Sequence, residues 1–153
     1  MMRSHSEACS AIVAVSEPWK TLRERIDFSK YMALNQAYVY LKEGEPAGFI
    51  IFTPDPVFAR GGYIRAVAVD PVMRRHGIGE KLLAFAETVI ARRSPNAYLC
   101  VSSFNRRGQM FYRSLGYTRV GSLPDLIVQG ASEYIYWKRL RPLPLKNRRI
   151  HRL

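Results

Sequence analysis

A short, basic turn with two glycines stands where an apolar strand pattern gives way to a helical one. Residues 70–83 read DPVMRRHGIGEKLL, with two arginines and a histidine directly before Gly77 and Gly79. The first turn of a helix carries backbone N–H groups without intrahelical partners, and glycine lets an anion approach them closely. The turn therefore predicts a site that binds a phosphate group.

The spacing of the glycines excludes the two commonest nucleotide-binding motifs. A GxxxxGK[ST] loop requires lysine after its last glycine, but Gly79 is followed by Glu80. The dinucleotide fingerprint G-x-G-x-x-G requires a glycine at position 82, where Leu82 stands. What remains is the pattern R-x-x-G-x-G over residues 74–79.

A second pattern, N-x-x-G-x-x-F-Y-x-x-x-G-Y, covers residues 105–117. Asn105 suits the cap of a helix that runs to Leu115, and Gly116 suits the left-handed position after its last turn. From the residues alone, Tyr112 is either a core tyrosine on this helix or a functional group.

Together the two patterns resemble the signature of the GNAT superfamily of N-acetyltransferases. In that family R/Q-x-x-G-x-G/A cradles the pyrophosphate of acetyl-CoA, and N-x-x-A-x-x-F/L-Y-x-x-x-G-F/Y follows downstream. The resemblance covers roughly residues 36–138. It implies an α/β fold, with a mixed, mostly antiparallel central sheet that splays at the acetyl-CoA site and is flanked by helices.

The resemblance also implies roles for individual residues. Asn105 would hydrogen-bond the pantetheine arm, and Tyr112 would lie near the thioester sulfur as general acid for the leaving thiolate. The strand residues that would offer backbone groups to the pantetheine are Val67, Ala68 and Val69. The residues that would surround the pyrophosphate are Arg74, Arg75, His76, Gly77, Ile78, Gly79 and Glu80. The implied reaction moves an acetyl group from acetyl-CoA, the donor co-substrate, to a primary amine of an unidentified small molecule or protein.

The general base is where the sequence departs from the family pattern. Many members carry a glutamate on the strand before the glycine turn or on the strand after the next helix. Here residues 63–69 hold no acid, and residues 97–101 hold Cys100. We expect water relayed through tyrosine or serine side chains to take the amine proton, with Glu133 as a second candidate. Cys100 is expected to be a small buried hydrophobic residue rather than a nucleophile.

Hydrophobic periodicity predicts the elements that position these residues. Helices are predicted at 7–15, 17–33, from 78 to the Ser-Pro-Asn at 94–96, and at 105–115; strands are predicted at 36–41, 47–53, 63–69, 97–101, 117–120 and 133–138. Loops are predicted over the stretch marked by Pro54, Pro56 and Gly61-Gly62 and over residues 121–132. Phe85 is expected on the apolar stripe of its helix, and Trp19 either lines the acceptor site or anchors a helix.

The predicted organisation is a single domain over residues 1–138 and a basic tail over 139–153. The net charge is +12, and residues 138–153 contribute seven Lys/Arg and no acid. Such a surface attracts polyanions, so nucleic-acid binding through the tail is open, although we do not favour it. Residues 1–6 lack the strand with which the family usually begins. Either that strand is missing, or another segment, such as the tail of a partner subunit in a homodimer, takes its place.

Two alternatives to an active enzyme remain from the sequence. One is a catalytically inactive CoA-binding regulatory module, and the other is a basic nucleic-acid or ribosome-associated protein. No apolar run is long enough to span a bilayer and no export signal is evident, so we expect a cytoplasmic protein without a membrane partner. Two distant cysteines and three scattered histidines indicate neither a disulfide framework nor a metal site.

Overall fold

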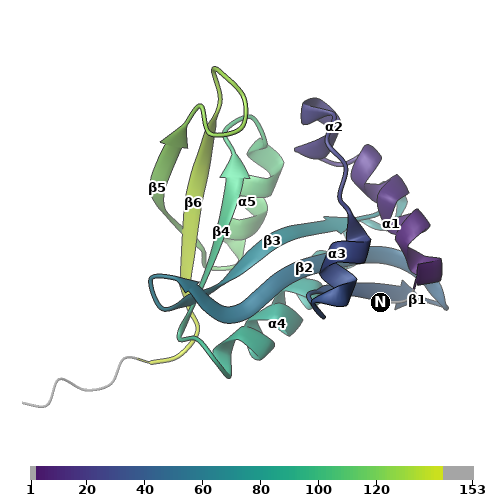
Figure 1. Ribbon diagram of the computed structural model, residues 1–153, viewed down its shortest axis with the longest axis horizontal. Helices are drawn as coiled ribbons and strands as arrows, with labels where there is room; N and C mark the ends of the chain where they lie inside the picture. The colour runs from purple at the N-terminus through teal and green to yellow at the C-terminus, as the bar shows by residue number, and fades with distance from the viewer. Residues whose placement is uncertain (1–2, 143–153) are drawn as a thin grey trace, which may run out of the picture.

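The computed structural model describes residues 3–142 and shows an α/β fold around one six-stranded sheet (Figure 1). Its elements are α1 (Arg3–Ala14), α2 (Trp19–Leu22), α3 (Phe28–Ala33), β1 (Ala37–Lys42), β2 (Glu45–Phe58), β3 (Gly61–Val69), the 3-10 helix η1 (Pro71–Met73), α4 (Ile78–Ala91), β4 (Asn96–Ser102), α5 (Arg106–Ser114), β5 (Thr118–Pro124) and β6 (Ser132–Arg139). The strand order is β1-β2-β3-β4-β6-β5, and every neighbouring pair is antiparallel except β3 and β4. The predicted fold class and order of elements are confirmed.

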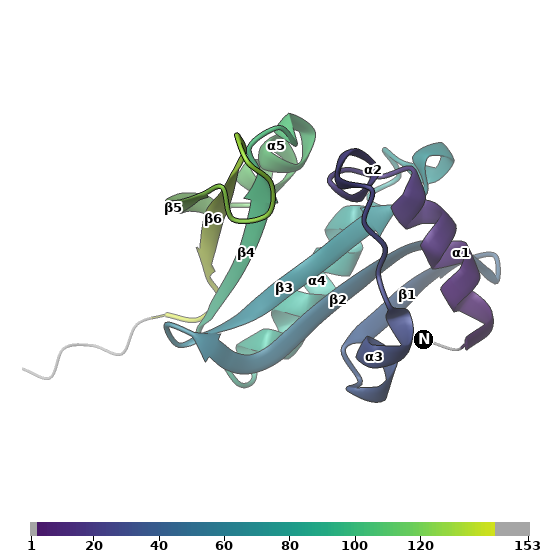
Figure 2. The ribbon, with the colours of Figure 1, turned by 45° about the horizontal axis from the view of Figure 1, so that its top comes forward.

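Helices cover both faces of the sheet (Figures 1 and 2). The buried residues of α4, each at most 4% exposed, recur at helical spacing and pack on β2, β3 and β4: Ile78, Leu82, Leu83, Ala86 and Ile90. On the other face, Phe28 of α3 packs edge-on against Phe49 of β2, with ring centroids 5.0 Å apart. The central strands β2 and β3 are therefore buried between two hydrophobic layers.

The strands β3 and β4 pair only at their beginnings and then separate, as Figure 2 shows. Their parallel ladder ends at the pair Ile64 and Leu99. The next residue of β3, Arg65, has no partner in the register between β3 and β2, so the strand carries a bulge there. A bulge bends a strand and increases its twist. The predicted opening of the sheet is therefore present, and it begins at this bulge.

The predicted helix over residues 17–33 is wrong, because the chain forms two short helices instead. Arg23 adopts a left-handed φ of 54° and ends α2. The Asp27 side chain then accepts a hydrogen bond from the backbone N–H of Ser29 and caps α3. Residues 24–27 cross from one helix to the other without regular structure.

Two predicted loops are also wrong. β2 continues through Pro54 and Pro56 to Phe58, and β3 already begins at Gly61. The ladder between the two strands is interrupted between Thr53 and Phe58, so the missing proline N–H groups break no strand pairing. β5 extends to Pro124, which reduces the predicted loop to residues 125–131.

Phe85 is 43% exposed rather than part of the core stripe. Its ring instead packs edge-on against Tyr38 of β1, with centroids 4.9 Å apart. It therefore covers the edge of the sheet instead of filling the interior.

Within residues 3–142, α1 is the first element and β1 forms one edge of the sheet, so the expected first strand is absent from this part of the chain. Residues 143–153, most of the predicted basic tail, lie outside the described residues, as do residues 1 and 2. No helix in the described part is long and apolar enough to cross a membrane.

Candidate functional site

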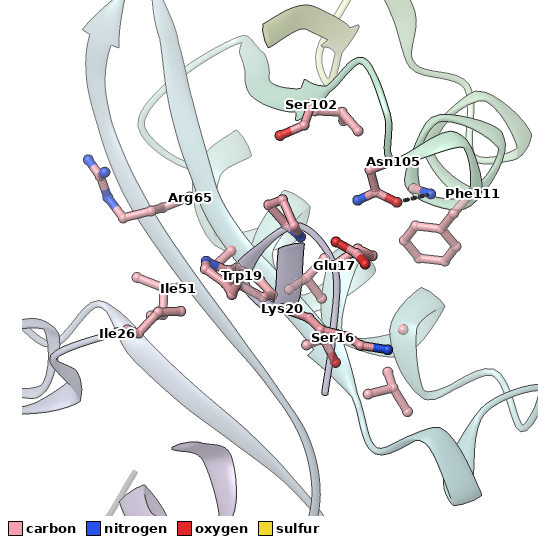
Figure 3. Close-up of a pocket in the computed structure, with 18 of the residues that line it drawn as sticks. Ser16, Glu17, Trp19, Lys20, Ile26, Ile51, Arg65, Ser102, Asn105 and Phe111 are labelled. Atoms are coloured by element: carbon pink, nitrogen blue, oxygen red, sulfur yellow. Dashed lines mark hydrogen bonds between the residues drawn. The ribbon is translucent and has the colours of Figure 1, made fainter. Parts of the chain in front are cut away.

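The separation of β3 and β4 opens a cleft of about 1090 Å³. Its walls are the second half of β3, the turn at 74–80, the end of β4 and the start of α5, and residues 15–31 pass over it. Figure 3 shows Ser102 and Asn105 on the β4–α5 side, with Arg65 and Ile51 across from them. Of the predicted site residues, all except His76 line this cleft.

The glycine turn presents the first turn of α4 to the cleft. Gly77 is the N-cap of α4 and has a φ of 71°, which favours glycine, and a Cβ there would meet nothing within 4 Å. A Cβ at Gly79 would lie 3.1 Å from the ring of Phe111, so this glycine allows α5 to pack against α4. The free amides and the positive end of the α4 dipole thus face an open space that suits an anion.

Arg74 connects the end of β3 to the segment that follows α1. Its Nε donates to the carbonyl oxygen of Val69 at 3.2 Å, and its Nη2 donates to Ser16 Oγ at 3.3 Å. Burial lowers the pKa of the Arg74 guanidinium, and the nearby Arg107 lowers it further. His76 lies outside the cleft, where its Nδ1 is 2.9 Å from the carbonyl oxygen of Arg74.

Asn105 caps α5 through one polar group of its side-chain amide. Its Oδ1 accepts a hydrogen bond from the backbone N–H of Gly108 at 2.9 Å (Figure 3). A Cβ at Gly108 would lie 2.7 Å from Asn105 Nδ2, so the glycine makes room for this amide. Within the described residues Nδ2 donates to no protein group, and it lies in a residue that lines the cleft.

Tyr112 is half-buried on the cleft wall, and its ring is held edge-on between those of Phe111 and Tyr117, at 5.2 and 5.8 Å. Burial raises the pKa of the Tyr112 hydroxyl, and the nearby Tyr63 raises it further. The hydroxyl has no hydrogen-bond partner among the described residues. A protonated hydroxyl with a fixed ring is the form that a general acid requires.

On the β4–β6 side of the cleft Glu133, the second candidate base, belongs to a polar cluster that the sequence does not predict. Ser102 Oγ donates to Glu133 Oε1 at 2.5 Å, and the thiol of Cys100 lies beside the hydroxyl of Tyr63. Cys100, expected to be buried, is only partly so and borders the cleft; burial still raises the pKa of its thiol. The β4–β6 register places Ser102 opposite Glu133, 31 positions along the chain, and a single sequence carries no signal of that register.

The end of the cleft between residues 17–31 and the β5–β6 loop, here called its outer end, is lined by both apolar and charged side chains. Trp19 lines the cleft, and its ring centroid lies 6.2 Å from that of Phe49, so it packs α2 against the sheet. Leu126 and Ile127, exposed on the β5–β6 loop, also line this end. The Arg65 guanidinium lies 5.5 Å from the centroid of the Tyr63 ring.

The Acetyltransferase (GNAT) family model matches residues 2–117. The chain belongs to the GNAT acetyltransferase family. No curated protein sequence matches it.

Solved GNAT structures share the fold at low sequence identity. An aminoglycoside 6'-N-acetyltransferase complexed with coenzyme A is 19% identical, with a TM-score of 0.73 over 94% of each chain. The ribosomal-protein-S18-alanine N-acetyltransferase from Escherichia coli is 18% identical, with a TM-score of 0.73 over 96% of this chain and 95% of its own. Nourseothricin acetyltransferase is 23% identical, with a TM-score of 0.63 over 69% of this chain; the chain spans 65% of that protein.

Acetyl-CoA is the acetyl donor in this family, and the residues present fit it. The turn before α4 offers free amides at an unobstructed glycine, and the amide Nδ2 of Asn105 has no protein partner among the described residues. β3 beyond Ile64 has no ladder with β4, which leaves backbone groups for an extended arm to bind. The cleft therefore suits a long, phosphorylated thioester.

Proposed function

We propose that this GNAT protein is an N-acetyltransferase that moves the acetyl group of acetyl-CoA to a primary amine. The observation that carries the proposal is that a protonated tyrosine and a turn with free backbone amides for a phosphate group line the same cleft. Tyr112 and Gly77 lie on its walls, and the bulge at Arg65 opens it between them.

The donor would occupy the inner walls of the cleft. Its pyrophosphate would accept hydrogen bonds from the amides of residues 77–80, with Arg75 and Arg107 adding positive charge. Its pantetheine arm would run beside β3 and meet Asn105 Nδ2. The thioester sulfur would then lie toward Tyr112.

The reaction then needs few groups. The neutral amine attacks the thioester carbonyl, the C–N bond forms and the C–S bond breaks. Tyr112 donates its proton to the departing thiolate, and the nitrogen loses a proton that restores the Tyr112 hydroxyl. Because the pKa of Tyr112 is raised, the hydroxyl stays protonated throughout the neutral range.

The acceptor would enter at the outer end, between residues 17–31 and the β5–β6 loop. The names of two structural neighbours give an aminoglycoside and a ribosomal-protein alanine as their acceptors. Both offer a primary amine, and we propose an acceptor of that kind here.

Calorimetric titration with acetyl-CoA, beside ATP and dephospho-CoA, tests the proposal. We expect acetyl-CoA to bind at least about 10-fold more tightly than ATP, a difference of about 1.4 kcal/mol. Mass spectrometry then follows acetylation of an aminoglycoside, an alanine-initiated peptide, an Nα-blocked lysine and a polyamine. Equal binding of ATP would reduce the turn to a general anion site. Acetyl-CoA binding without transfer to any amine would identify an inactive CoA-binding module.

Replacing Asn105 with aspartate is expected to separate its role as the cap of α5 from its proposed role in binding acetyl-CoA. Aspartate can still accept from the Gly108 N–H, so the free energy of unfolding should change by less than about 0.5 kcal/mol. The loss of the Nδ2 donor should weaken acetyl-CoA binding about 10-fold, the value of one hydrogen bond. Calorimetry and urea unfolding measure the two effects.

The matched variant Asn105→Ala removes both roles. It should weaken binding similarly and also cost about 1 kcal/mol of stability. If Asn105→Asp instead binds acetyl-CoA as tightly as the wild type, Asn105 serves only as a helix cap.

A further inference from the structure

Glu133 is unusual among the side chains that the structure describes. It is 7% exposed, and no other carboxylate, lysine or arginine in residues 5–142 is buried to this degree. Neither of the ion pairs among these residues includes it. A buried carboxylate without a cation costs stability. Packing alone therefore gives no reason for a glutamate at this position.

The carboxylate is held in one orientation and open on one side. Ser102 Oγ donates to Oε1, and the β4–β6 register fixes the two residues opposite each other. Oε2 accepts no hydrogen bond from the described residues and is not a fully buried atom, and the residue lines the cleft. One oxygen is thus anchored, and the other is left without a partner within residues 3–142, in a residue that lines the same cleft as Tyr112.

The groups that face Glu133 include no cation among the described residues. They are Tyr63 from β3, Cys100 and Ser102 from β4, and Glu24 from the segment between α2 and α3. Leu123, its partner on β5, is apolar. Burial raises the pKa of Glu133, Glu24 raises it further, and only the bond from Ser102 opposes them. A carboxylate with a raised pKa is a stronger base toward an ammonium group.

We propose that Glu133 is the general base of the acetyl transfer and that Ser102 is its positioning residue. This inference rests on the proposed function. The acceptor arrives as an ammonium ion, gives one proton to Glu133 Oε2 and becomes a neutral amine. As the C–N bond forms and the C–S bond breaks, the nitrogen loses its second proton. Tyr112 protonates the thiolate and recovers a proton from the nitrogen, and Glu133 releases its own proton to solvent.

The test compares two amines that are small for a cleft of about 1090 Å³, so that it does not depend on the identity of the natural acceptor. Methylamine is almost wholly protonated near neutral pH, whereas hydroxylamine is neutral. Release of the CoA thiol from acetyl-CoA gives the rate for the wild type and Glu133→Gln. We expect kcat/KM for methylamine to fall about 100-fold and that for hydroxylamine to fall less than about 10-fold, because only the first needs a base before attack.

Two further variants complete the comparison. Ser102→Ala leaves the carboxylate of Glu133 in place but removes the hydrogen bond that orients it. We therefore expect kcat/KM to fall less than in Glu133→Gln, and to fall more for methylamine than for hydroxylamine. Glu45→Gln, at the exposed first residue of β2, is the matched control and should retain the wild-type rates.

Each outcome decides between the two proposals. If the wild type binds no acetyl-CoA, or binds it but acetylates neither these two amines nor any amine of the panel above, the proposed function fails and this inference fails with it. If the wild type acetylates both amines and Glu133→Gln matches it, only the base assignment fails. Equal losses with both amines would show that Glu133 maintains the shape of the site, which also overturns the assignment.

Thermal unfolding measured across pH tests the raised pKa of Glu133 without an activity assay. Folding raises the pKa of Glu133 above its unfolded value of about 4.3, so the wild type loses stability as the pH rises through the folded pKa. The glutamine of the Glu133→Gln variant carries no such charge and can still accept from Ser102. The variant should therefore melt higher than the wild type above the folded pKa and equally below about pH 4. A variant that melts lower at every pH would make Glu133 a structural residue.

Discussion

Acetyl-CoA affinity is expected to fall by about 100-fold or more in Gly77→Asp. A Cβ at Gly77 meets no atom within 4 Å, and aspartate tolerates a positive φ, so the fold should remain intact. The new carboxylate would stand at the N-terminus of α4, where the pyrophosphate is proposed to bind. Repulsion between these like charges in a partly buried site amounts to several kcal/mol. Calorimetric titration measures the loss directly.

The matched variant Gly77→Asn separates charge from bulk. Asparagine has nearly the same shape and the same tolerance for the left-handed region, but it carries no charge. We expect its affinity for acetyl-CoA to lie within about 10-fold of the wild type, and the difference between the two variants to shrink at high salt. Wild-type affinity in Gly77→Asp would place the pyrophosphate away from this turn.

In Tyr112→Phe, kcat for acetyl transfer is expected to fall about 100-fold, the lower end of a general-acid contribution. Phenylalanine keeps the edge-on contacts with Phe111 and Tyr117, so the acetyl-CoA affinity should stay within about 2-fold. The raised pKa of Tyr112 also predicts that this hydroxyl produces no alkaline fall in rate below about pH 10. Steady-state rates with hydroxylamine and calorimetry provide both values.

Tyr38→Phe is the control for this substitution. Its hydroxyl donates to the carbonyl oxygen of Asn35 on the far edge of the sheet, so kcat should remain unchanged. An undiminished kcat in Tyr112→Phe would mean that water protonates the thiolate, and Tyr112 would then be a wall of the cleft only.

Local patterns predicted the elements around the turn at 74–79 because the causes of their structure lie within a few residues. Gly77 caps α4 and Asn105 caps α5, and each acts through conformation or a hydrogen bond inside its own turn. The wrong predictions concern residues whose structure depends on partners far away in the sequence. The prolines of β2 are tolerated because β3 leaves that stretch unpaired, and Phe85 is exposed because Tyr38 provides a partner at the sheet edge.

By itself the sequence determined the fold class, the family signature and most of the segments that line the cleft. Those features depend on periodicity and on short motifs, which a single chain displays in order. Only the tertiary structure decided where β3 leaves β4, since a bulge depends on the register with β2. It also decided that Ser102 holds Glu133 beside the cleft. The pairing of β4 with β6 joins residues 31 positions apart, and the burial that raises the pKa of Glu133 exists only once the strands have packed.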